Sequence, residues 1–194
     1  MSDWKRDLKR ANQFLPHVKR LLGLHLIGEA SIEMDQKQAV DLIVLGIGSH
    51  KIGVRMRDIK RYRHGPNFLR YLQEFTIRCD RPSGTSTELE KILNGFGDYI
   101  FYGWGWFERG DGVVRAYYLI DLTVFRATYK AQPRFNNHDR SSAFVACRVA
   151  DFPASLIIAQ GGFDYLRRVF KGTIREATPE PVVASDGQSW MWVE

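Results

Sequence analysis

Residues 41–58, DLIVLGIGSHKIGVRMRD, have the pattern of a β-hairpin, because two alternating apolar runs flank a glycine-rich turn. The first run opens on Asp41, and the second carries Arg55 and Arg57. Side chains of a strand alternate between its two faces, so the two arginines share one face and the apolar residues around them share the other. We therefore expect the second strand to be apolar on one side and cationic on the other.

The next strand-like run, EFTIRCDR, repeats this segregation, with Glu74, Thr76 and Arg78 on one face and apolar residues on the other. If this strand lies beside the hairpin in matching register, its charged residues converge with Asp41 and Arg55 on one patch. In the alternative interpretation, Arg55 and Arg78 pair with Asp41, Glu74 or Asp58 and keep a sheet edge soluble.

The composition indicates one domain over 1–194, with a core at about 15–126 and a C-terminal elaboration at 127–194, because 44% of the residues are hydrophobic. The net charge of +6 favours an acidic partner such as nucleic acid, for which we expect DNA. Cys79 and Cys147 lie in separate strand-like runs, which predicts two buried thiols in a reducing compartment. No apolar run reaches the roughly 18 residues of a membrane span, so we expect a cytoplasmic protein with no membrane partner.

The remaining pattern alternates helices and strands, which is typical of an α/β fold. The expected elements are a helix over 17–30, a helix over 83–95 that starts at a Ser or Thr cap, aromatic strands over 98–107 and 113–125, and a strand over 143–152. The stretch over 154–172 is ambiguous and is compatible with short helices.

A basic stretch runs through and beyond the hairpin, from Lys51 to Arg81, and has aromatic residues in its loop. Such a mixture suits phosphate contacts with occasional base stacking, although arginine-rich surface loops also serve solubility. The candidate nucleic-acid-binding residues are Arg57, Lys60, Arg61, Arg63, Arg70 and Arg81.

The order of these elements resembles the core of the PD-(D/E)XK, or restriction-endonuclease-like, superfamily. IEMDQKQAVDLIVL looks like the acid-rich approach to the first metal-binding aspartate, which would be Asp41. KIGVRMRD is similar to the strand that reads acid, any residue, lysine in that superfamily. The resemblance covers about residues 15–107 and implies a restriction-endonuclease-like core, with a mixed central sheet flanked by helices.

The sequence departs from the superfamily at the second half of this motif. Gly53 and Arg55 stand where the family has its second carboxylate and its lysine, and an alternative alignment onto EFTIR places Thr76 and Arg78 there. Arginine can stabilise developing charge, but it does not release its proton at neutral pH. The departure therefore leaves an electrostatic role for these arginines and no role as a base.

What the resemblance implies is a magnesium-dependent nuclease that cuts DNA. The candidate catalytic residues are Asp41, Glu74, Arg55 and Arg78, and the candidate Mg²⁺ ligands are Asp41, Glu33, Glu74 and Glu88. For Glu88 the alternative is a charge in the first turn of a helix, where it favours the helix dipole.

The missing acid-x-lysine triplet favours a second function on the same fold. In this alternative the protein is a non-catalytic binding module whose cationic face holds nucleic acid or an acidic protein, for example as a phage-encoded inhibitor of a host system. The runs FTIR, TELEKI, GDYIFYGW and LIDL resemble phage-type proteins to which we attach no activity.

Overall fold

The computed structural model describes residues 9–23, 27–29, 42–44, 50–62, 68–80, 84–137 and 142–170. Their strands form a mixed six-stranded sheet and an antiparallel three-stranded sheet. The larger sheet has the order β1 (Ile27–Glu29), β2 (Leu42–Val44), β3 (His50–Asp58), β5 (Tyr99–Gly105), β6 (Val114–Asp121), β9 (Ile157–Gly161). The smaller sheet has the order β4 (Glu74–Asp80), β8 (Ala143–Arg148), β7 (Arg134–Asn136).

Short helices connect the strands, and the fold is mixed α/β, as expected. They are α2 (Leu15–Leu21), η2 (Ile59–Tyr62), α4 (Phe68–Tyr71), α5 (Glu88–Leu93), α6 (Leu122–Thr128), η3 (Val149–Asp151), η4 (Ala154–Leu156) and α7 (Phe163–Phe170). None of the described helices is both long enough and apolar enough to cross a membrane.

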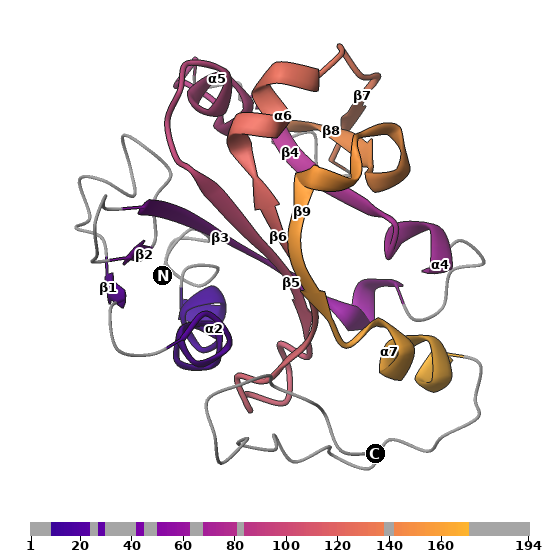
Figure 1. The fold of residues 1–194 in the computed structure, drawn as a ribbon. Helices are drawn as coiled ribbons and strands as arrows, with labels where there is room; N and C mark the ends of the chain where they lie inside the picture. The colour runs from indigo at the N-terminus through magenta and orange to yellow at the C-terminus, as the bar shows by residue number, and fades with distance from the viewer. Residues whose placement is uncertain are drawn as a thin grey trace.

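The larger sheet has a different cover on each face. On one face, Phe14 and Val18 at α2 pack against apolar side chains of β3, β5 and β6, among them Met56 and Phe101. On the other face, the aromatic side chains of β5 and β6 pack against β4, β8 and the helices α5, α6 and α7. Figure 1 shows α2 on one side of the larger sheet and β4 with α4 on the other. The smaller sheet thus faces the side of β3 that carries Arg55 and Arg57.

The predicted hairpin is confirmed in its pairing, because β2 and β3 are antiparallel neighbours, with Ile43 opposite Lys51. Alternation along β3 is confirmed as well. Ile52 and Met56 belong to the core on the α2 side, and they are 2% and 8% exposed, while the arginines lie on the opposite face.

The predicted position of the third strand is wrong. A restriction-endonuclease-like core predicts that the strands starting at Asp41, Lys51 and Glu74 are adjacent in one sheet, but β4 lies in the smaller sheet. The place beside β3 belongs to β5, which runs parallel to it. Asp98 fixes this pairing at the start of both strands, since its side chain accepts a 2.7 Å hydrogen bond from the Lys51 N–H and its own N–H donates to the Lys51 carbonyl at 2.9 Å.

The predicted helix over 17–30 is wrong in its second half. The helix α2 ends at Leu21, and Gly23 adopts φ = +87°, a conformation that favours glycine and stops a helix. Residues 27–29 then form β1 instead of a further helical turn.

The predicted strand over 113–125 is also too long. The strand β6 ends at Asp121, whose side chain accepts hydrogen bonds from the N–H groups of Thr123 and Val124, at 2.7 and 3.2 Å. This is an N-terminal cap, and the following residues form α6. In the ambiguous stretch over 154–172, the structure has η4, β9 and α7.

The residues after 126 complete both sheets, because β8 pairs with β4 and β9 pairs with β6. Both cysteines are free thiols and buried, as predicted. Burial raises the pKa of the Cys147 thiol to about 12, and the nearby carboxylates of Asp151 and Glu74 raise it in the same direction. Cys147 therefore stays a neutral core residue at physiological pH.

Candidate anion-binding site

A cavity of about 260 Å³ lies between the two sheets. Four strands contribute side chains to its wall, two from each sheet, and we call it the arginine pocket. Its lining residues are Arg55 and Arg57 on β3, Tyr102 and Trp104 on β5, Glu74, Thr76 and Arg78 on β4, Ala143, Phe144 and Ala146 on β8, and Tyr71, Asn137 and Ser142 beside these strands.

The period of two along each strand explains why these side chains meet. On β4, the even-numbered residues from Glu74 to Arg78 line the pocket, while Phe75 and Ile77 point into the core and are each 1% exposed. The predicted alternation of β4 is therefore confirmed. Arg55, Glu74 and Arg78 share one pocket although their strands are in different sheets.

The pocket carries an excess of positive charge. Among the described residues, its charged lining side chains are three arginines and the single carboxylate of Glu74. The guanidinium of Arg55 also donates through Nη2 to Oε2 of Glu88, and the same oxygen accepts the N–H of Arg78 at 3.2 Å. Glu88 thus ties the start of α5 to both β3 and β4.

A capping box places Glu88 at this position. The Thr87 N–H donates to Oε2 of Glu90 at 2.8 Å, and the Glu90 N–H donates to Oγ1 of Thr87 at 3.3 Å. This reciprocal pair fixes the first turn of α5, and Glu88 is its first residue. The predicted cap at a Ser or Thr is confirmed, and Glu88 has a guanidinium partner besides the helix N-terminus.

Arg57 is held against Tyr102. Its Nε donates to the Tyr102 hydroxyl at 2.7 Å, and its guanidinium carbon lies 5.4 Å from the centre of the Tyr102 ring. The same hydroxyl is 3.2 Å from Oγ1 of Thr76. A short polar chain therefore links the two sheets and fixes the direction of the Arg57 side chain.

Glu74 lines the pocket and is 4% exposed. Its Oε1 accepts a 2.8 Å hydrogen bond from Nε of Arg70, whose side chain is 59% exposed. Arg70, a predicted nucleic-acid contact, therefore pairs with an acid of the pocket. Its hydrogen bond and the Glu74 charge raise the pKa of Arg70, so it stays protonated.

Sequence reasoning missed Tyr102, Asn137 and Ser142. The side chain of Asn137 donates to Oγ of Ser142 at 2.6 Å, the Asn137 N–H donates to the Ser142 carbonyl at 2.9 Å, and both residues line the pocket. Tyr102 lies in an aromatic run that reads as core, and alternation alone does not say which aromatic hydroxyl meets an arginine.

The other predicted nucleic-acid-binding residues do not line the pocket as far as the structure describes them. Lys60 forms a 2.5 Å ion pair with Glu108, and both side chains are more than half exposed. The side chain of Arg61 lies outside the described parts of the chain, as do Arg63 and Arg81.

The described residues do not supply the donor set of a magnesium site. Glu74 and Glu88 are each bonded to an arginine, and within the described ranges no three His, Cys, Asp or Glu side chains gather. Mg²⁺ takes oxygen ligands, and guanidinium groups at the same carboxylates compete with it. The two other predicted ligands, Glu33 and Asp41, lie outside the described residues.

Comparison with known proteins leaves the site to be judged on its geometry. No protein-family model matches the chain, and no curated protein and no solved structure matches it either.

Proposed function

We propose that the protein is a nucleic-acid-binding module that holds DNA phosphates in the arginine pocket. The observation that carries the proposal is the convergence of Arg55, Arg57 and Arg78 from two sheets on one cavity. The chain as a whole has a net charge of +6, which favours the approach of a polyanion.

The chemistry of the pocket suits a phosphate group. A guanidinium presents a planar fork of N–H donors that matches phosphate oxygens, and Arg57 is oriented in advance by Tyr102. Because the hydrogen bond to Tyr102 already holds Arg57, this side chain loses little freedom when a ligand binds. A preformed cationic pocket of this kind can bind and orient DNA without any chemical step.

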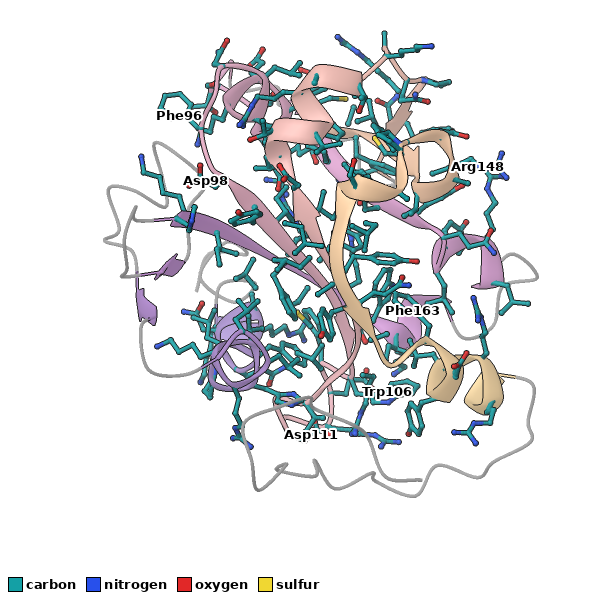
Figure 2. The ribbon with its side chains drawn as sticks, in the orientation of Figure 1. Phe96, Asp98, Trp106, Asp111, Arg148 and Phe163 are labelled. Carbon is teal, nitrogen blue, oxygen red and sulfur yellow. The ribbon has the colours of Figure 1, made fainter. Side chains whose placement is uncertain are left out.

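Binding of fluorescent DNA to Arg78→Ala, measured by anisotropy, tests this proposal. We expect the affinity to fall by about tenfold or more, since a hydrogen bond to a charged group is worth about 1.5–3 kcal/mol. The matched control is Arg148→Ala, which removes an exposed arginine that does not line the pocket. Figure 2 shows Arg148 at the edge of the molecule. We expect the control to lose less than about threefold.

Equal losses in Arg78→Ala and Arg148→Ala would contradict the proposal, because DNA would then respond to total charge and not to the pocket. Thermal unfolding of both variants separates lost binding from lost folding. If wild-type protein does not bind DNA but an acidic protein is bound through Arg78, the partner in the proposal is wrong.

A magnesium-dependent DNA nuclease is a second candidate, favoured by the presence of Glu74 beside Arg55 and Arg78 in one pocket. Such an activity would depend on Asp41 and Glu33 for metal ligands. The restriction-endonuclease-like core is part of this candidate, and the position of β4 in the smaller sheet counts against it.

Cleavage assays with Mg²⁺ or Mn²⁺ distinguish the two candidates. A nuclease should lose cleavage in Asp41→Asn while DNA binding is unchanged or tighter, because a metal ligand and a negative charge are removed. It should keep or gain activity in Arg55→Lys and lose it in Arg55→Ala. A binding module cleaves no DNA in any of these variants, and Arg55→Ala lowers affinity alone.

A further inference from the structure

We infer that the arginine pocket admits an unpaired nucleotide, so that the protein prefers single-stranded DNA, with Tyr71 as the stacking surface for a base at the rim. This inference rests on the proposed function and adds the class of DNA. It follows from the size of the pocket and from Tyr71, the one exposed aromatic residue among its described lining residues.

The lining residues of the pocket range from almost fully buried to exposed. Trp104, Tyr102 and Glu74 are 1%, 3% and 4% exposed, whereas Tyr71 is 40% exposed and forms part of the rim. A ligand in the pocket therefore meets the ring of Tyr71 at the surface of the protein. The arginines lie on the strands that form these inner walls, and the Arg55 side chain is 27% exposed.

A DNA duplex offers this pocket less than a single strand does. Its bases are paired and stacked inside the helix, so a duplex can present backbone phosphates to the arginines but no base face to Tyr71. A cavity of about 260 Å³ between two sheets can take a nucleotide-sized unit and not a helix. A single strand can turn one phosphate and its base into the pocket without the cost of breaking base pairs.

Tyr71 suits the base of such a nucleotide. It is the last residue of α4, and this short helix packs against β4. Single-strand-binding proteins combine a cationic path for the backbone with aromatic rings on which bases stack. The rim ring and the arginines behind it reproduce this combination within one pocket.

The experiment compares two DNA probes with equal numbers of phosphates, an unstructured single strand and a fully paired duplex, in direct binding titrations. For the wild type we expect tighter binding to the single strand by about fivefold or more. Tyr71→Ala should lose this preference, and Tyr71→Phe should keep it because the ring remains. The matched control is Leu69→Ala on the same helix, which removes a 47% exposed apolar side chain outside the pocket lining and should keep the preference.

Equal binding of both probes by the wild type would overturn the inference, as would a Tyr71→Ala variant that keeps the preference or weakens both probes alike. Arg78→Ala separates these results from a failure of the proposed function. If Arg78→Ala still weakens binding while the duplex binds as well as the single strand, the pocket binds DNA and only the inference on strand type is wrong. If Arg78→Ala has no effect on DNA binding, the proposed function fails together with the inference on strand type.

Discussion

Single residues decide the charge of the pocket, and Glu88 matters most among them. Its carboxylate accepts from the side chain of Arg55 and from the N–H of Arg78, with 13% of the Glu88 side chain exposed. An internal carboxylate that is bound to a phosphate-binding arginine competes with the ligand for the same donors. We therefore expect Glu88 to stabilise the empty pocket and to oppose the proposed binding of phosphate.

We predict that Glu88→Gln binds DNA more tightly than the wild type, by about threefold or more, because the competing negative charge is gone. The variant should lose about 1 kcal/mol of stability, since a partly exposed ion pair contributes little more. Anisotropy titrations and thermal unfolding measure the two effects.

The matched control is Glu108→Gln, which removes the same charge from the surface pair with Lys60. Tighter binding in both variants would show that only net charge matters. Weaker binding in Glu88→Gln alone would mean that Glu88 contributes to the ligand site and does not compete with it.

At the scale of elements, α2 is tied to the start of β6 through His17. The Val114 N–H donates to Nδ1 of His17 at 2.8 Å, and His17 is 6% exposed. The pKa of His17 is lowered from 6.5 to about 4, chiefly by burial and next by the charges of Arg20 and Arg115, while Asp111 opposes the shift. The neutral ring is therefore the form that the fold requires.

This geometry predicts acid sensitivity. The unfolded chain binds a proton on His17 below about pH 6.5 and the folded chain does so only near pH 4, so stability is fully present above this window and falls as the pH is lowered through it. The loss should be on the order of 3 kcal/mol. Urea unfolding at neutral pH and near pH 4 measures it.

His17→Asn is the control, because an asparagine oxygen can accept from the Val114 N–H but does not titrate. We expect the difference in unfolding free energy between the two pH values to become smaller in this variant. An unchanged difference would assign the acid sensitivity to other groups.

The period of two within β3 and β4 made the pocket-facing residues predictable, because local alternation decides which side chains share a face. The pairing of strands was not predictable in the same way. Lys51 and Asp98 are 47 residues apart, and their hydrogen bond helps to place β5, and not β4, beside β3. The partner of Arg55 escaped prediction for the same reason, since Glu88 meets it only through the packing of α5 on β4.

At the scale of the whole molecule, the pocket exists because a second sheet covers one face of the larger sheet. The aromatic side chains of β5 and β6 fill most of this interface, and the cationic face of β3 lies at its open side. Polar groups replace apolar packing along the face of β3 that lines the pocket. Hydrogen bonds such as the one from Arg57 to Tyr102 offset the free-energy cost of burying these polar groups. The arginine pocket thus depends on both sheets and not on one element.

The central claim is that DNA phosphates bind in the arginine pocket, and the salt dependence of DNA affinity tests it most directly. Each phosphate contact adds about 0.7 to the slope of log K against log salt for a single strand. The double variant Arg57→Ala/Arg78→Ala should lower the magnitude of this slope by about 0.7 or more, which corresponds to at least one lost phosphate contact. The comparison variant is the triple variant Lys60→Ala/Arg61→Ala/Arg63→Ala in the basic stretch that follows β3. It should flatten the slope only in part, and its DNA binding should still weaken further when Arg78 is also replaced. The claim would be contradicted if the slope were unchanged in Arg57→Ala/Arg78→Ala and if the salt dependence were lost in the triple variant. DNA would then bind at Lys60, Arg61 and Arg63 and not in the arginine pocket.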